Sequence, residues 1–492
     1  MAAAGAATVL CLAFLNAAGA RAAGAHAAAV ARLAASGGTW GKAEKVPGLA
    51  ALNQGGFAQI TSVSCGSAGN CAAVGFYSTA SLHNQAFVVS EAKGAWGKAE
   101  AVPGLAALSQ GRNATLESVS CGSAGNCAAS GSYFPNRHSQ QAFVVSEVKG
   151  TWGKAEAVPG LAALNQGRSA AIRSVSCGSA GNCSAGGIYT DGSGHGQAFV
   201  VHEVKGTWRK AEEVPGLAVL NQGGAAVVTS VSCASAGNCS AGGIYTDSSG
   251  NSQAFVVSEV TGTWRKAEEV PGLAALNQGG FAEVTSVSCA RAGDCGAGGD
   301  YQGRVGTFFH SEAFVVSEVK GIWEKAEEVP GTAALNKGGD AHTTSVSCPS
   351  AGNCSAGGSY FNKPGHQQVF VVTEVKGAWE TAQEIPGSGT LNQGGFADLF
   401  SASCGSAGNC GAGGSYFSTP VTVQAFVVSE VKGTWGKAEE VPGSGALNTA
   451  GFAIVNSVSC PPAGNCSAGG FYTYHAAGLR LESAFVVSET KG

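Results

Sequence analysis

The sequence predicts an all-β fold, an eight-bladed β-propeller with four strands per blade. Two observations carry that prediction: the chain repeats itself, and every repeat divides into four short strand-like segments. Tryptophans recur at a spacing of 56 residues, with one longer step of 59 between Trp264 and Trp323. Eight such units fill the chain from Trp40 to Gly492. Because the units are alike, we expect one domain at residues 37–492.

The four segments are clearest in the fourth repeat, where runs rich in β-branched and aromatic residues end at Gly, Asn or Pro. We name the expected strands a to d, in chain order: Val227–Cys233, Cys239–Tyr245, Gln253–Val260 and Thr263–Val270. The segment Leu220–Gly224 is expected to form a turn between strands d and a, because Asn and Gly tolerate positive φ. Apolar stripes at the helical spacing of 3.6 residues are absent, which excludes a helical solenoid.

The two ends of the chain predict that the ring is closed. The last repeat stops at Gly492, where every other repeat continues into a strand that carries tryptophan. A spare strand of this kind stands at the other end, around Trp40. If the N-terminal strand completes the last blade, no sheet edge is left exposed.

Seventeen cysteines comprise Cys11 and eight pairs with a constant separation of six residues. No histidine or acidic residue recurs beside the pairs, so a metal site lacks further ligands. Cysteines that face each other across a hairpin are close enough to bridge, and we expect eight disulfides within single repeats. The expected bonds join Cys65 to Cys71, Cys121 to Cys127, Cys177 to Cys183, Cys233 to Cys239, Cys289 to Cys295, Cys348 to Cys354, Cys404 to Cys410, and Cys460 to Cys466.

Composition predicts a secreted, extracellular protein. Residues 1–36 are Ala-rich, with an apolar run from Ala7 to Leu15 and small residues at Ala20 and Ala22, a pattern typical of a signal peptide. No later apolar run approaches the roughly 20 residues that span a bilayer. With a net charge of −4 and 12% charged residues, the chain has no basic surplus for nucleic acid. We expect a monomer.

The segment from Ser258 to Trp264 resembles the Asp-box hairpin of sialidase-like propellers, which joins the third and fourth strands of a blade. It departs from that pattern at Val260, where the family has Asp, and in a Gly-to-Trp spacing that is one residue shorter. The whole repeat also resembles repeats of exported bacterial β-propeller proteins without assigned chemistry. The resemblance implies a propeller fold over residues 40–492 and brings no catalytic motif with it.

The segments between strands b and c vary among the repeats, while the rest of the repeat is constant. In a propeller these b–c segments share one face with the turns between strands d and a. A constant scaffold with variable loops on one face is typical of a binding surface, although unconstrained drift of the loops is the alternative. Aromatic residues beside arginine mark two of these segments as candidate ligand-binding sites. The candidates are Arg304, Phe308, Phe309 and His310 in the longest segment, and Tyr472, Tyr474, His475 and Arg480 in the last.

A second candidate site breaks the repeat near the start of the innermost strand. At one register, three consecutive blades carry Glu283, His342 and Asp398. These residue types can ligate a divalent metal or transfer protons, so we expect the three side chains to converge on a shared ion or water. The alternative is that they are polar groups solvated by water in the channel.

These observations favour a non-catalytic, exported binding or adhesion scaffold that recognises a protein or a glycan through the variable segments. A sialidase-like glycoside hydrolase and a purely structural extracellular protein are the alternatives. Motifs for a nucleophile elbow, a zinc protease helix, a phosphate-binding loop or an EF-hand are absent, and we expect no cofactor. Whether the chain is an enzyme is left open, because a propeller can assemble a catalytic site from distant blades.

Overall fold

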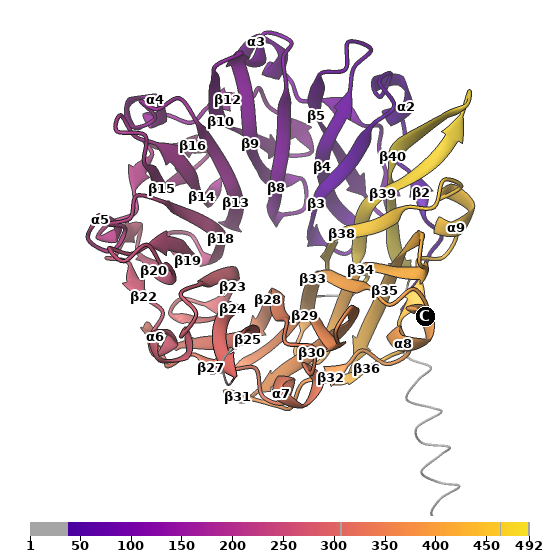
Figure 1. Cartoon of the computed structure of the whole chain (residues 1–492). Coiled ribbons are helices and arrows are strands. Elements are labelled where there is room, and N and C mark those ends of the chain that lie inside the picture. Colours follow the sequence, from indigo (N-terminus) through magenta and orange to yellow (C-terminus); the bar gives the residue numbers. More distant parts are fainter. Residues whose placement is uncertain (1–37, 306–307, 463, 491–492) are drawn as a thin grey trace, which may run out of the picture.

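The computed structural model describes residues 38–305, 308–462 and 464–490, which form a ring of eight blades around a central channel (Figure 1). The expected eight-bladed propeller is confirmed. The expected leader at residues 1–36, including Cys11, lies outside the described residues.

Each blade is an antiparallel sheet whose strands follow chain order from the channel outward. Blades 1 to 7 follow the order of the chain, and blade 8 joins its two ends. The innermost strands, at position a, are β3 (Ala58–Ser67), β8 (Ala114–Ser123), β13 (Ala170–Ser179), β18 (Ala226–Ser235), β23 (Ala282–Arg291), β28 (Ala341–Ser350), β33 (Ala397–Ser406) and β38 (Ala453–Ser459). The b strands are β4 (Asn70–Ser78), β9 (Asn126–Asn136), β14 (Asn182–Thr190), β19 (Asn238–Thr246), β24 (Asp294–Val305), β29 (Asn353–Lys363), β34 (Asn409–Thr419) and β39 (Ser467–Ala476).

The two outer strands of each blade differ in regularity. The c strands are long: β5 (Asn84–Ala92), β10 (Ser139–Val148), β15 (Gly196–Val204), β20 (Ser252–Val260), β25 (Phe308–Val319), β30 (His366–Val375), β35 (Thr422–Val431) and β40 (Leu479–Thr490). Strand d, expected as one strand, is split in two. Its first pieces are β6 (Ala95–Trp96), β11 (Thr151–Trp152), β16 (Thr207–Trp208), β21 (Thr263–Trp264), β26 (Ile322–Trp323), β31 (Ala378–Trp379), β36 (Thr434–Trp435) and β1 (Thr39–Trp40). Its second pieces are β7 (Glu100–Ala101), β12 (Glu156–Ala157), β17 (Glu212–Glu213), β22 (Glu268–Glu269), β27 (Glu327–Glu328), β32 (Gln383–Glu384), β37 (Glu439–Glu440) and β2 (Glu44–Lys45).

Strand d is split because its middle bonds to the neighbouring blade. In blade 4 the amide of Ala267 donates to the carbonyl of Pro215, at 2.8 Å, instead of continuing the ladder with β20. The sequence pattern could not show this hydrogen bond, because it joins two repeats.

The expected d–a turn also contains one turn of helix that the sequence pattern did not predict. In blade 5, Gly272 has a φ of 78° before α6, and this left-handed conformation favours glycine. The first helical residue, Leu273, is 1% exposed and fills the core between two blades. The first residue of the helix is buried in every blade, as Thr or Ser in α7 to α9 and as Leu in the others. The helices are α2 (Leu49–Leu52), α3 (Leu105–Ser109), α4 (Leu161–Leu164), α5 (Leu217–Leu220), α6 (Leu273–Leu276), α7 (Thr332–Leu335), α8 (Ser388–Leu391) and α9 (Ser444–Leu447).

The N-terminal strand closes the ring, as the sequence predicts. β1 pairs antiparallel with β40, and Trp40 lies opposite Glu489. β2 pairs with the same strand further along. The last blade is therefore built from both ends of the chain.

All eight expected disulfides are present, each within its own blade, and in blade 4 the bonded residues Cys233 and Cys239 are direct cross-strand neighbours. Each disulfide thus fastens strand a to strand b beside the channel. The eight bonds are Cys65 to Cys71, Cys121 to Cys127, Cys177 to Cys183, Cys233 to Cys239, Cys289 to Cys295, Cys348 to Cys354, Cys404 to Cys410, and Cys460 to Cys466.

The second cysteine of every pair is buried, because its side chain packs in the core between two blades. These cysteines are therefore structural residues that fasten strand a to strand b within each blade. They are Cys71, Cys127, Cys183, Cys239, Cys295, Cys354, Cys410 and Cys466.

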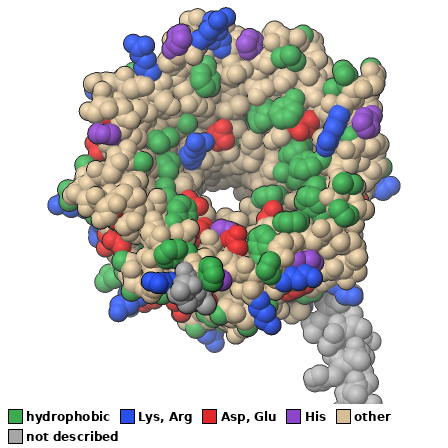
Figure 2. All heavy atoms as spheres, in the orientation of Figure 1, with side chains coloured by type: hydrophobic (Ala, Val, Ile, Leu, Met, Phe, Trp, Pro, Cys, Tyr) green, Lys and Arg blue, Asp and Glu red, His purple; other side chains and the backbone are tan. Residues whose placement is uncertain are grey.

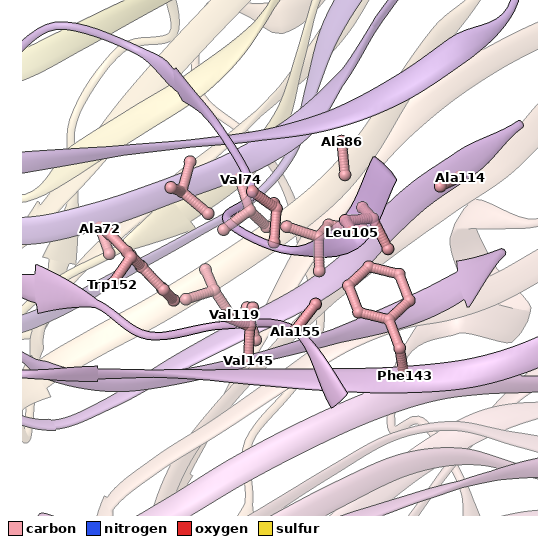
Figure 3. Close-up of a cluster of buried hydrophobic side chains, with 14 of the residues drawn as sticks. Ala72, Val74, Ala86, Leu105, Ala114, Val119, Phe143, Val145, Trp152 and Ala155 are labelled. Atoms are coloured by element: carbon pink, nitrogen blue, oxygen red, sulfur yellow. The ribbon is translucent and has the colours of Figure 1, made fainter. Parts of the chain in front are cut away.

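The hydrophobic core lies between neighbouring blades (Figure 3). Val74 and Val88 of blade 1 pack against Leu116, Phe143 and Trp152 of blade 2, and all five are buried. Such packing requires small residues where strands approach most closely. A Cβ added at Gly242 would lie 2.5 Å from a methyl group of Val284 in the next blade, so a larger residue does not fit.

Among the described residues, no helix is long and apolar enough to cross a membrane.

Candidate functional site

The most distinctive site lies at the channel, where three consecutive blades depart from the repeat. The second residue of strand a and its partner on strand b are apolar in blades 3, 4 and 8: Ala171 and Ile188, Val227 and Ile244, Ile454 and Phe471. Blade 1 carries Gln59 and Phe76 at this register and blade 2 the neutral polar pair Thr115 and Ser132. Ionisable side chains stand there only in blades 5 to 7: Glu283 and Asp300, His342 and Ser359, Asp398 and Ser415. Figure 2 shows acidic side chains and a histidine gathered on the channel wall over β23, β28 and β33.

His342 is the centre of this channel cluster. Its Nε2 lies 2.5 Å from Oδ1 of Asp340, and its Nδ1 lies 3.4 Å from Oδ1 of Asp300. Burial disfavours the charged imidazole, but the two carboxylates more than compensate and raise the pKa of His342 to about 10. The imidazole is therefore protonated near neutral pH and carries a positive charge between two acidic groups.

Glu283 and Asp398 flank this imidazolium on its two sides. Burial raises the pKa of Glu283, the charge of Asp300 raises it further, and His342 lowers it. Burial also raises the pKa of Asp398, against hydrogen bonds from Ser359 and Gln367 and the charge of His342. The charge of His342 thus lowers the pKa of both carboxyls.

The structure therefore brings the three expected residues into one electrostatic cluster, but their direct partners are different ones. His342 lies within ion-pair distance of Asp300 and Asp340. Asp398 accepts a hydrogen bond from Gln367. The sequence pattern alone did not reveal these three partners. Asp300 and Asp340 break the repeat in the same way as the residues that were found: other blades carry Ile, Phe or Ser in place of Asp300, and mostly Phe, Ala, Ser or Asn in place of Asp340.

In the part of the chain that the structure describes, no group of three or more His, Cys, Asp or Glu side chains has the arrangement of a metal site. A protonated imidazole is also no metal ligand, because both nitrogens already carry hydrogen. A metal at Glu283, His342 and Asp398 would have to displace that proton.

The b–c segment of blade 5 stands next to the channel cluster. It was expected to be a loop, but β24 and β25 continue as a hairpin in which Arg304 lies opposite Phe309 and Gly303 opposite His310. The two phenylalanine side chains are 73% and 56% exposed at Phe308 and Phe309, respectively. The two rings therefore form an exposed aromatic patch on one hairpin.

This hairpin rests on the turn that carries Asp340. A Cβ at Gly339 would overlap Nδ1 of His310, so only glycine leaves room for the imidazole. Ser311 forms an isolated parallel bridge with Asp340. The exposed aromatic rings and the charged cluster are thus connected through one turn, and together they form what we call the blade 5–6 site.

The four candidates of blade 8 divide into exposed and buried residues. His475 and Arg480 are exposed and lie opposite each other on β39 and β40. Tyr474 is half-buried and contacts Tyr472, with ring centroids 5.8 Å apart. Tyr472 itself is 2% exposed and belongs to the core, so its assignment to the surface was wrong. Its position recurs in every blade as a buried tyrosine, for instance Tyr245, which is the mark of a packing residue.

Known proteins resemble this chain only distantly. No protein-family model matches the chain, and no curated protein matches it. Similar solved structures include the GH74 xyloglucanase from Xanthomonas campestris, with 12% identity and a TM-score of 0.42 over 91% of this chain and 55% of the xyloglucanase. This chain thus spans about half the length of that protein.

Two further structures are similar over most of their own length. One is the subtype N11 neuraminidase-like protein of a flat-faced bat isolate from Peru, at 11% identity and a TM-score of 0.38, over 93% of this chain and 95% of that protein. The other is a family PL25 ulvan lyase, at 10% identity and a TM-score of 0.42, over 74% of this chain and 90% of the lyase. Likeness at this level concerns the fold alone.

Proposed function

We propose that this chain is an exported, non-catalytic binding scaffold that recognises a glycan through the blade 5–6 site. The single observation that carries the proposal is the pair of exposed rings at Phe308 and Phe309 beside an acidic, histidine-containing cluster. Aromatic rings stack on the apolar faces of sugars, and carboxylates accept hydrogen bonds from sugar hydroxyls. Both kinds of contact lie on the variable face of an otherwise constant ring.

Export is part of this proposal. Eight disulfides fit an oxidising environment, and residues 1–36 are proposed to be the leader that takes the chain there. N-terminal sequencing of protein recovered outside the cell tests this step. A mature protein that still begins at Met1 would contradict it.

A glycan array with the purified ring tests the recognition step. We expect the wild-type protein to bind a restricted set of glycans, and a Phe308→Ala and Phe309→Ala double variant to lose at least about ten-fold in affinity for that set. The matched control is Leu82→Ala, since Leu82 is 74% exposed on the b–c segment of blade 1, away from the site. Binding that persists in the double variant, or protein capture without any glycan signal, would overturn the proposal.

A hydrolase remains the alternative, and the cross-strand pair of Glu283 and Asp300 is the observation that favours it. Two neighbouring carboxyls, one with a raised pKa, are the groups that glycoside hydrolysis uses. Incubation of the array hits with wild-type protein and with Asp300→Asn separates the two functions. Release of sugar by the wild type alone would identify an enzyme, whereas a binding scaffold leaves the glycans intact.

The shared ion or water at Glu283, His342 and Asp398 stays a prediction. Calorimetric titration with zinc, calcium and manganese, repeated on His342→Ala, decides whether a metal occupies it. Equal heats in both proteins would leave the cluster as a site for water or sugar hydroxyls.

A further inference from the structure

A series of pockets lies between neighbouring blades on the face opposite the b–c segments. Each pocket is closed by an a–b turn and by c–d turns. The pocket between blades 4 and 5 has a volume of about 430 Å³, and the equivalent pocket between blades 3 and 4 about 340 Å³. The pocket between blades 5 and 6 is much smaller, at about 30 Å³. Because the lining positions repeat, each pocket serves as a control for the others.

The pocket between blades 4 and 5 is lined by three cationic side chains, Arg265, Arg291 and Lys320. Two of them break the repeat. The position of Arg265 is Gly or Glu in six of the other blades, and Arg only at Arg209 in the preceding blade. The position of Arg291 is Ser in six other blades and Pro in one.

The lining also carries three acidic side chains, Glu259, Asp294 and Glu318, so its formal charges balance and an anion has to be held by hydrogen-bond donors that these acids leave unused. Arg291 donates from Nε to Asp294 at 2.7 Å. This contact leaves the two terminal nitrogens of the guanidinium to donate to a ligand, and the side chain is 67% exposed. Over residues 38–305, 308–462 and 464–490, neither Arg265 nor Lys320 takes part in an ion pair shorter than 4.0 Å.

Two buried glutamates, Glu259 and Glu318, line the pocket, and both already accept hydrogen bonds; Glu259 is 2% exposed and accepts from Ser184 at 2.9 Å. Glu318 is 2% exposed, and its two oxygens accept hydrogen bonds from Ser258 at 2.8 Å and Ser240 at 3.2 Å. Burial raises the pKa of Glu318, and the positive charge of Arg265 acts in the opposite direction. Arg265 therefore interacts with Glu318 through its charge, and its side chain lines the pocket.

The neighbouring pocket, between blades 3 and 4, has no arginine or lysine in its lining. Between blades 3 and 4, Thr261 replaces Lys320, His202 replaces Ser258, and neither arginine position contributes to the lining. The pocket between blades 5 and 6 has no cationic lining residue either. Of these three pockets, one alone combines room for a ligand with a set of cations.

We propose that the pocket between blades 4 and 5 binds an oxyanion, either a free inorganic anion or the carboxylate or sulfate group of an acidic sugar. Guanidinium groups bind such oxyanions through parallel hydrogen bonds, and an ammonium adds a point charge. This inference lies on the opposite face from the blade 5–6 site and does not depend on it.

Isothermal titration at low ionic strength tests the proposal, with sodium sulfate and sodium glucuronate as the two probes. We expect wild-type protein to bind at least one probe, with an affinity that falls as sodium chloride is added. The variant Arg265→Gly, Arg291→Ser, Asp294→Asn installs the residues that other blades use, including the Ser–Asn bond seen at Ser235 and Asn238. We expect it to fold normally and to lose at least about ten-fold in affinity.

Arg209→Gly is the matched control, because it removes an arginine from the same register one blade earlier, where the equivalent pocket is not lined by it. We expect its affinity to equal that of the wild type. Equal binding by the triple variant, an equal loss in the control, or no binding to either probe by the wild type would each overturn the proposal. Binding of glucuronate without sulfate would identify a sugar carboxylate as the ligand group.

Discussion

Two seams, meaning the contacts between neighbouring blades, contain a tryptophan and a buried glutamate at equivalent positions but differ in how these two groups are hydrogen-bonded. Between blades 1 and 2, Ser90 donates to Glu147 at 2.6 Å and accepts from Nε1 of Trp152 at 3.0 Å. Between blades 6 and 7, Thr373 stands at the equivalent position, and neither Nε1 of Trp435 nor Oε2 of Glu430 has a hydrogen-bond partner among the described residues. We call a seam satisfied where the tryptophan Nε1 and the glutamate both hydrogen-bond to the hydroxyl, as with Ser90, and unsatisfied where they do not, as with Thr373.

The satisfied arrangement is the rule of this ring. A serine hydroxyl joins the tryptophan of the next blade to its glutamate at six seams, through Ser90, Ser146, Ser258, Ser317, Ser429 and Ser488. Threonine carries a hydroxyl too, but its branched Cβ restricts χ1, so the oxygen does not reach both partners. A hydroxyl at this position is therefore not enough, because it must lie within hydrogen-bond distance of both the tryptophan and the glutamate.

The largest effect is expected where the seam depends on the end of the chain. Trp40 donates to Ser429 at 3.0 Å, and Ser429 in turn donates to Glu489 at 3.0 Å, so the N-terminal strand supplies one member of this seam. Deleting residues 39–46 removes β1, β2 and a buried tryptophan. We expect a loss of stability of more than about 3 kcal/mol, measured by chemical denaturation. A variant that lacks only residues 1–36 is the control, and equal midpoints for the two would contradict closure.

Breaking a satisfied seam should have the next largest effect. Ser90→Ala leaves Nε1 of Trp152 and an oxygen of Glu147 buried without a partner, which costs about 1–3 kcal/mol. Thr373→Ala at the unsatisfied seam is the matched control, and we expect less than half of that loss. If the two substitutions cost the same, the serine bridge does not distinguish the seams.

Repairing the unsatisfied seam should stabilise the ring in a pH-dependent way. Burial raises the pKa of Glu430 to about 7. Because the folded protein holds this proton more tightly than the unfolded chain does, stability falls as pH rises from about 4.5 to about 7. Thr373→Ser supplies a donor to the charged carboxylate, so its folded pKa should drop and that fall should shrink.

We therefore expect Thr373→Ser to gain about 1 kcal/mol at about pH 8 and about half of that at about pH 4.5, where only Nε1 of Trp435 gains a partner. Denaturation of both proteins at the two pH values measures it. Ser317→Thr, made at a satisfied seam, should produce the opposite change. A gain for Thr373→Ser that is independent of pH would show that packing, not the Glu430 proton, is responsible.

Features that depend on contacts within one repeat could be predicted from the sequence, because a repeated pattern reports local structure; the cysteine spacing predicted every disulfide in this way. Closure was predicted because the last repeat lacks a tryptophan strand and a spare one stands at Trp40. The split strand d and the helix at Leu273 could not be predicted, since both depend on contacts with another blade. The buried glutamates look like ordinary polar positions of strand c until the neighbouring blade is in place.

The candidate site was predictable to the extent that it breaks the repeat. Comparison of one register found Glu283, His342 and Asp398, but not Asp300 or Asp340, which lie on another strand and on a turn. Aligning every position of the repeat, not only the innermost strand, would have found them. Tyr472 shows the opposite error, because its aromatic type suggested exposure while its recurrence indicated burial.

The smallest effect is expected at the remaining irregular seam, between blades 3 and 4. His202 stands there in place of serine, Trp264 has no partner for its Nε1 among the described residues, and Nδ1 of His202 lies 3.9 Å from Glu259. His202→Ser should restore the bridge to Trp264, but it also removes the charge that opposes the raised pKa of Glu259. Ser184 already donates to Glu259 at 2.9 Å, so this carboxylate gains less from a new hydroxyl than Glu430 does.

We expect His202→Ser to give a net gain in stability of only about 0.5 kcal/mol at about pH 8. Denaturation curves at about pH 8 measure this value, and a gain as large as that from Thr373→Ser at the same pH would show that the imidazole contributes nothing to this seam.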